Sequence, residues 1–274
     1  SSPAMTAERQ RSPDQYFALT LLIRMAVTAA FLLAATITAE RAGPLVGGLV
    51  ATLPISAGPV YIFLALDHGA HFIGVSALGS LVTNGINIAF ALTYALLAQK
   101  RSLAVSLSGA FVLWAVLNWL TGFFVWNLPA AILLNVVVLA VSLWLSASLR
   151  HVRSPQVKAR WHDLLMRAAM VALLVGIVVT LSYHIGPTAS GNLAVFPIVL
   201  TSIILILHRR VGGPATAAVM ANAVIGLGGF GIACITLHLA ADPLGAVVAL
   251  SLTLAVSFGC NLLVFFARRR LVAP

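Results

Sequence analysis

The stretch GPLVGGLVATLPISAGPVYIFLALDHG, from Gly43 to Gly69, is an apolar segment that glycine and proline interrupt. A related stretch, GPTASGNLAVFPIVLTSIILILHRRVG, runs from Gly186 to Gly212, and an offset of 143 positions aligns the two without a gap. Other scarce residues match at the same offset: Arg24 with Arg167, Gly48 with Gly191, Pro54 with Pro197, and Asn118 with Asn261. Two copies of one unit, each with a Gly/Pro-interrupted helix in the same place, are typical of a transporter built on internal symmetry.

The composition places the whole chain in a membrane. Hydrophobic residues make up 61% of the 274 residues and charged residues only 8%, whereas about a quarter of a soluble domain is charged. The formal net charge is +10, but the 16 Lys and Arg residues occur in short clusters between apolar runs. We therefore interpret them as topology signals rather than as a nucleic-acid surface, and expect no nucleic-acid partner.

A helix needs about 20 apolar residues to cross the hydrocarbon core of a bilayer. The predicted architecture is an all-α polytopic membrane protein with nine transmembrane helices. The spans are residues 17–39, 44–66, 72–98, 103–125, 128–149, 164–184, 187–207, 215–239 and 245–267. Four spans belong to a first repeat in residues 5–125, one linking helix occupies residues 126–150, and four spans form a second repeat in residues 159–268.

The linking helix makes the second repeat inverted relative to the first, because it adds one crossing between two units of four. Positive residues flank the spans unequally, with two on the amino-terminal side and twelve on the other. The positive-inside rule then places the amino terminus outside and the carboxyl terminus in the cytoplasm, in a bacterial-type inner membrane. Treating the two Gly/Pro stretches as re-entrant loops gives eight against six, so we prefer nine crossings.

The two interior prolines mark the predicted substrate site. Pro54 and Pro197 each lie ten residues into a span, roughly 15 Å deep, where proline removes a backbone donor. With Gly48 or Gly191 nearby, each helix can unwind and direct its peptide dipoles at a ligand. The alternative is a simple kink without a binding role.

Arg24 and Arg167 lie within or close to predicted spans, where a charge is costly unless it has a function. We expect them to bind substrate, or alternatively to cap carbonyl groups of the broken helices. All six acidic residues map to tails, loops or span edges, so no acidic partner is expected at the depth of Arg24. A neutral to positive interior favours an anionic or neutral amphipathic substrate.

Amides and hydroxyls within the spans complete the predicted site. They are Thr52, Ser56, Asn84, Asn118, Asn192, Thr201 and Asn261. Such groups line polar cavities, and with unwound carbonyls they suit Na⁺ as a coupling ion; the alternative is simple hydrogen bonding between helices. We predict no metal site, since His68 and His71 lack further ligands.

The predicted function is a secondary active transporter that moves a small organic anion or amphipathic metabolite by alternating access. A lipid flippase is the alternative, and a channel is a weaker one. We expect no enzyme activity, because no nucleophile with its base is recognisable in the sequence. Membrane lipids are expected partners, and a homodimer is compatible with the pattern.

Overall fold

The computed structural model describes residues 13–41, 57–151 and 160–272, and within these ranges the secondary structure is entirely helical. In chain order the helices are α1 (Pro13–Arg41), α3 (Ala57–Leu97), α4 (Leu103–Thr121), α5 (Leu128–Leu145), the short η2 (Ala147–His151), α6 (Trp161–Ala194), α7 (Ile198–Val211) and α8 (Gly213–Val272). Among the described residues, six helical segments are long and apolar enough to cross a membrane. The chain is therefore a helical, multi-pass membrane protein, as its composition predicts.

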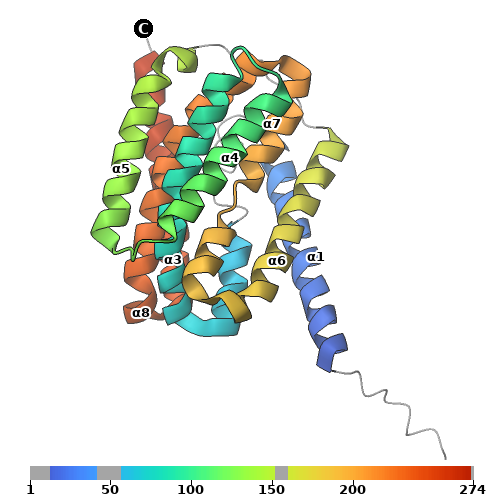
Figure 1. Cartoon of the computed structure of the whole chain (residues 1–274). Helices are drawn as coiled ribbons and strands as arrows, with labels where there is room; N and C mark the ends of the chain where they lie inside the picture. Colours follow the sequence, from blue (N-terminus) through green and yellow to red (C-terminus); the bar gives the residue numbers. More distant parts are fainter. Residues whose placement is uncertain (1–12, 42–56, 152–159, 273–274) are drawn as a thin grey trace, which may run out of the picture.

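Glycine bends divide the longest helices. α8 has 60 residues, a length of roughly 90 Å, far more than the roughly 30 Å of a hydrocarbon core. It turns back at Gly245, α3 turns back at Gly69, and α6 turns at Gly186, each with a φ between 75° and 83°. These backbone angles are open to glycine and strained for other residues. Figure 1 shows the two parts of α8 running side by side after the turn.

The local sequence explains where several helices begin. The Asn127 side chain accepts a hydrogen bond from the Ala130 N–H at 3.0 Å and so caps α5. At the start of α6, the Asp163 carboxylate accepts a hydrogen bond from the Arg160 N–H at 2.9 Å. Both contacts satisfy backbone donors that the first turn of a helix leaves without a partner.

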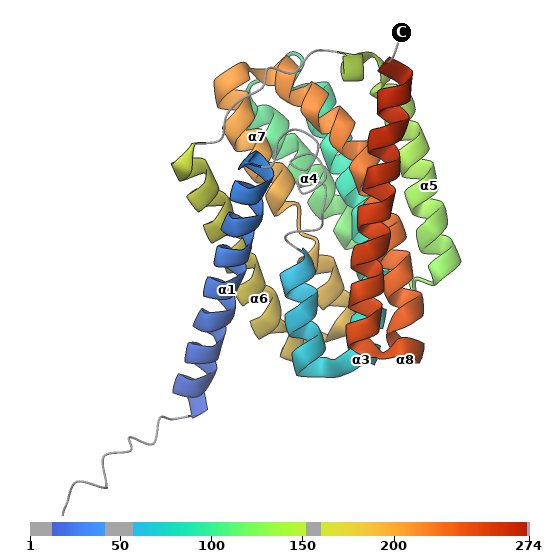
Figure 2. The same ribbon diagram turned by 180° about the vertical axis from the view of Figure 1, so that it is seen from behind.

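The second part of α3, from Ala70 to Leu97, forms the centre of the bundle. Of the 18 consecutive residues of α3 that are most apolar, 83% are buried. The corresponding segments of α1, α4 and α5 are each only 11% buried. α3 packs against α4, α5, α6 and α8, while α1 lies mainly along α6. Both ribbon views show α1 and α6 together at one side of the molecule (Figures 1 and 2). The outer helices present leucine, valine and tryptophan side chains outward, as lipid contact requires.

Helix boundaries recur at the offset of 143 that aligns the two sequence copies. The bend at Gly69 corresponds to Gly212, which ends α7, and their φ values are 83° and 84°. α4 begins at Leu103, and the equivalent position follows the bend at Gly245. The two aligned stretches thus share one bend and one helix start at equivalent positions.

Predicted and observed span limits differ most at the second Gly/Pro stretch. α4 and α5 begin at Leu103 and Leu128, where the sequence predicts. The span predicted at residues 187–207 is not continuous, because α6 ends at Ala194 and α7 begins at Ile198. The interruption falls at Pro197, the residue predicted to break this helix. The corresponding part of the first Gly/Pro stretch, up to Ser56, lies outside the described residues.

Candidate functional site

The break between α6 and α7 is the most distinctive feature of the described interior. Val195 leaves the helical conformation with φ −109° and ψ 21°, and Pro197 precedes the first turn of α7. The Thr201 hydroxyl donates a hydrogen bond to the Pro197 carbonyl at 2.7 Å. Carbonyl groups that such a break frees at membrane depth must find partners in protein, water or ligand.

Three side chains of α3 donate hydrogen bonds to carbonyl groups of α6 and of the break. Ser76 Oγ donates to the Pro187 carbonyl at 2.9 Å, and Ser80 Oγ donates to the Gly191 carbonyl at 2.6 Å. Further along α3, Asn87 Nδ2 donates to the Val195 carbonyl at 2.7 Å. Each donor is buried. The interrupted helix is therefore held by hydroxyl and amide groups of the central helix.

Further contacts orient two of these donors. The Tyr61 hydroxyl lies 2.6 Å from Ser80 Oγ, and both side chains are buried. The Trp114 Nε1–H donates to Asn87 Oδ1 at 2.9 Å, so both ends of the Asn87 amide are used. In the amide orientation that satisfies both of its atoms, Asn192 donates to the Gly79 carbonyl at 2.9 Å. The crossing of α3 and α6 is thus a connected polar network.

Glycines permit this close approach of α3 and α6. A Cβ atom built on Gly191 would overlap the Ser76 carbonyl, and one built on Gly79 would lie 2.5 Å from the Thr188 carbonyl. Since real Cβ atoms do not come so close to backbone, neither position accepts a larger residue without a shift of the helices. Small residues at helix crossings are the usual means of such approach in membranes.

A second polar cluster joins α3, α5 and α8. Asn84 Nδ2 donates to Asn135 Oδ1 and to the Leu227 carbonyl, both at 2.9 Å. Asn135 in turn donates to the Leu81 carbonyl at 2.7 Å and to the Ala131 carbonyl at 2.9 Å. Asn84 Oδ1 is buried and has no hydrogen-bond partner within the described residues. The helix α5 therefore contributes directly to the interior.

The expectation that Arg24 lacks an acidic partner is wrong. Its Nη1 and Nη2 atoms lie 2.5 and 2.7 Å from the two carboxylate oxygens of Asp67, and its guanidinium lies 5.3 Å from the Phe63 ring centroid. The Asp67 side chain is only 8% exposed. The arginine side chain is long enough to extend from α1 to the end of the first part of α3. The position of Arg24 within its predicted span does not show how far this side chain extends. In the described part of the broken helix, the carbonyl groups of Pro187, Gly191 and Val195 accept hydrogen bonds from α3.

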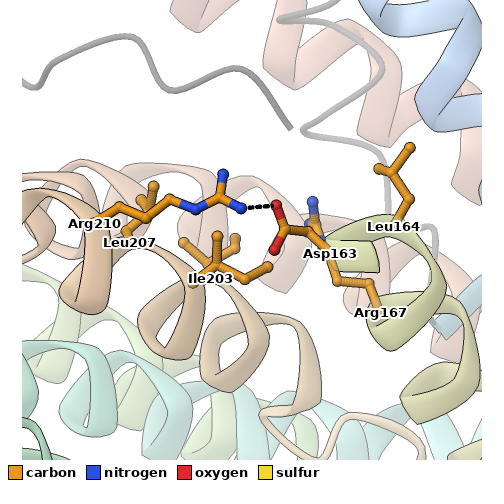
Figure 3. Close-up of a pocket in the computed structure, with 7 residues that line it drawn as sticks. Asp163, Leu164, Arg167, Ile203, Leu207 and Arg210 are labelled. Carbon is orange, nitrogen blue, oxygen red and sulfur yellow. Dashed lines mark hydrogen bonds and ion pairs between the residues drawn. The ribbon is translucent and has the colours of Figure 1, made fainter. Parts of the chain in front are cut away.

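Arg167 belongs to a different charged group. It lines a cavity of about 150 Å³ between α6 and α7, together with Asp163, Leu164, Ile203, Ile206, Leu207 and Arg210. Figure 3 shows the Asp163 carboxylate between Arg210 and Arg167, and Asp163 forms an ion pair with Arg210. Arg24 and Arg167 are equivalent in sequence, yet the structure places them in separate charged groups.

The structure does not bring the remaining predicted residues together in one site. Asn118 donates to the Trp114 carbonyl and Asn261 to the Ser257 carbonyl, both one turn earlier in the same helix and both at 2.9 Å. Residues Gly48, Thr52, Pro54 and Ser56 lie outside the described part of the chain.

The predicted site included the α3 amide of Asn84 but missed the hydroxyl donors Ser76 and Ser80, although these residues form a readable pattern. Ser76, Ser80, Asn84 and Asn87 are spaced by four, four and three residues within an apolar helix, so they share one face. A polar stripe of this kind predicts contact with another polar element rather than with lipid. Asp67 and Arg210 were also missed as partners, but they occupy equivalent positions two residues before Gly69 and Gly212.

No protein-family model, curated protein or solved structure matches this chain. The site must accordingly be interpreted from its own chemistry. The described residues contain no group of three or more His, Cys, Asp or Glu side chains that could hold a metal ion. What the interior offers is a broken helix, hydroxyl and amide donors, and paired charges.

Proposed function

We propose that this protein is a secondary active transporter that moves a small organic anion or amphipathic metabolite across the inner membrane by alternating access. The observation that carries this proposal is the interruption of α6–α7 at Val195–Pro197, where Ser80 and Asn87 of the central helix bind carbonyl groups. Broken helices that meet polar groups near the midplane form the substrate sites of many such carriers.

The chemistry of these contacts suits reversible binding. Hydroxyl and amide groups exchange hydrogen-bond partners at little net cost, since one hydrogen bond to protein contributes only about 1 kcal/mol. A substrate with polar groups can take the places of Ser80 or Asn87 at the freed carbonyls. Because Asp67 balances the charge of Arg24, the described interior favours a neutral amphipathic substrate at least as strongly as an anion.

The proposal includes the inverted arrangement of the two repeats, which two sets of contacts support. Asn84 donates to the Leu227 carbonyl, and these two residues are equivalents at the offset of 143. Equivalent residues meet only near an axis that relates the copies.

The ends of the central helices provide the second set. Gly74, near the start of the second part of α3, packs against Ala241, and Gly213, at the start of α8, packs against the Ala98 carbonyl. The start of each central helix thus contacts the end of the other, so the two equivalent helices run in opposite directions. Two half-units in opposite orientations offer two nearly equivalent states, one facing each side of the membrane.

Two ion pairs support closure at both ends. Arg24–Asp67 links α1 to the first part of α3, and Asp163–Arg210 links α6 to α7. Asp67 and Arg210 lie next to the bend of α3 and the α7–α8 junction, which are at opposite ends of the bundle (Figure 1). We propose that these pairs separate in turn as the site opens to one side and then the other.

The test is uptake of radiolabelled amphipathic metabolites and anions into proteoliposomes, with and without a Na⁺ gradient. We expect Asn87→Leu to reduce uptake at least tenfold, since it leaves the Val195 carbonyl and the Trp114 N–H without their partner. Asn222→Leu is the matched control, because Asn222 donates only within its own helix, to the Ala218 carbonyl at 2.8 Å.

Three outcomes would contradict the proposal or its site. Equal uptake by the Asn87→Leu variant and the wild type would leave transport in place but remove the broken helix from the mechanism. Continuous conductance in a planar bilayer would identify a channel. Movement of a fluorescent phospholipid between leaflets, without uptake of any soluble compound, would identify a flippase.

A further inference from the structure

The cavity between α6 and α7 contains the Asp163–Arg210 pair of the proposed closure, but the transport proposal does not use Arg167 or the apolar part of the lining. Two guanidinium groups, of Arg167 and Arg210, face one carboxylate, of Asp163, so its charged lining has a net charge of +1. The Arg210 and Asp163 side chains are 18% and 8% exposed. A partly buried group with more arginine than acid attracts an anion, and the planar guanidinium binds phosphate through two parallel hydrogen bonds.

The cavity has room for such a group. Its volume of about 150 Å³ is several times what one water molecule needs. Figure 3 shows Arg210 on α7 and Arg167 on α6 on either side of the Asp163 carboxylate. An oxyanion that enters between the two helices can therefore contact guanidinium groups from both of them.

The rest of the lining is apolar and runs away from the charged end. Ile203, Ile206 and Leu207 precede Arg210 by seven, four and three residues on α7, so the four residues share one helix face. Leu164 adds an apolar side chain from α6. A lining with a charged end and an apolar end matches an amphipathic anion better than a bare ion.

The charged end lies at the ends of both helices. Asp163 is in the first turn of α6, and Arg210 is in the last turn of α7. Trp161, at the start of α6, is 61% exposed, as expected for tryptophan at the level of lipid headgroups. Exposed Arg160 and Arg209 add positive charge nearby. Each arginine near an anionic membrane surface contributes about 1 kcal/mol of attraction.

We propose that this cavity binds a phosphate-class oxyanion, held by Arg167 and Arg210 and competing with Asp163 for Arg210. Two sources share this chemistry: the headgroup of an anionic phospholipid, whose chain would lie along Ile203 and Ile206, and a soluble phosphate. The cavity is separate from the break at Val195–Pro197 and shares only the Asp163–Arg210 pair with the proposed closure. Binding of the anion is measured without transport, so failure of the transport proposal would not remove it.

Native mass spectrometry of the full chain in detergent, with phosphatidylglycerol or phosphatidylcholine added, tests the lipid source, and thermal-shift titration with inorganic phosphate tests the soluble one. We expect Arg167→Gln to weaken binding about tenfold or more, because it removes a charge-assisted contact. Arg209→Gln is the matched control, since this exposed neighbour does not line the cavity. Detergent presents no anionic membrane surface to attract Arg209, so the affinity of this variant should stay within about twofold of wild type.

A variant that binds the anion more tightly distinguishes an effect on the binding site from a folding defect. Asp163→Asn removes the competing carboxylate but keeps an oxygen that can accept from the Arg160 N–H. We expect this variant to bind the anion several-fold more tightly, which a damaged fold cannot produce. Saturable binding of phosphatidylglycerol alone would assign the site to lipid, and equal binding of inorganic phosphate would assign it to a soluble anion. Unchanged binding in Arg167→Gln, an equal loss in Arg209→Gln, or no gain in Asp163→Asn would overturn the proposal.

Discussion

Arg24 shows how an isolated charge in the sequence acquires a partner in the fold. Its two terminal nitrogens face both carboxylate oxygens of Asp67, and both side chains are largely buried. The net contribution of such a pair is small, because desolvation of both ions opposes their attraction. Removal of only one partner is costly, since it leaves an uncompensated charge in an apolar environment.

We therefore expect Asp67→Asn to destabilise the protein by about 3 kcal/mol, and the double variant Arg24→Gln with Asp67→Asn to be more stable than this single variant. Apparent melting temperatures of the detergent-solubilised protein provide the measurement. The exchanged pair, Arg24→Asp with Asp67→Arg, should recover part of the loss. A double variant that is less stable than Asp67→Asn would show that the cost does not arise from an unpaired charge.

At the scale of elements, the α3–α6 crossing depends on side-chain size as much as on hydrogen bonds. Ser76 serves both purposes, because its hydroxyl binds the Pro187 carbonyl while its own carbonyl lies against Gly191. Ser80 can reach the Gly191 carbonyl only because the helices are this close. The hydrogen bonds that hold the broken helix therefore depend on the close glycine contact.

Gly191→Ala should destabilise the protein by about 1–3 kcal/mol, as overpacking does in a filled core. The added methyl group would also push Gly191 away from Ser80 and so reduce uptake in the transport assay. Gly259→Ala is the control, because nothing lies within 4 Å of a Cβ at that helical position, where alanine favours the helix by up to about 1 kcal/mol. A Gly191→Ala variant as stable and active as the control would show that the helices separate freely.

For the whole molecule, the decisive question is which end of the bundle faces the cytoplasm. The connection from α3 to α4 and the connection from α4 to α5 lie at opposite ends (Figure 1). Lys100 is exposed in the first connection and Val125 in the second. The positive-inside rule predicts that the end with Lys100 is cytoplasmic.

A membrane-impermeant maleimide should therefore label Val125→Cys in intact cells and label Lys100→Cys only after the membrane is opened. Both variants are made in a background without Cys234 and Cys260. The reverse labelling pattern would indicate the opposite orientation in the membrane, with the Asp163–Arg210 cavity at the outer face. Labelling of both positions in intact cells would disagree with membrane passage by α4.

Particular residues mark how far sequence reasoning reaches. The interruption near Pro197 and the starts of α4 and α5 are predictable because proline chemistry, capping residues and apolar length act locally. The partner of Arg24 is not predictable from the sequence, because helix tilt and side-chain length determine which charged groups meet. Asn135 was likewise not predicted, since only packing brings α5 against the Asn84 amide. The polar stripe of α3 was readable, but its target on α6 was not.

The sequence by itself determined that this chain is a helical membrane protein with a duplicated pattern of apolar spans, because the bilayer demands long apolar helices with satisfied backbones. Tertiary structure alone decided that Ser76, Ser80 and Asn87 hold the broken helix, and that the acids at span edges pair with arginines on neighbouring helices. Those contacts join residues more than 40 positions apart, and only the packing of whole helices determines which of them meet.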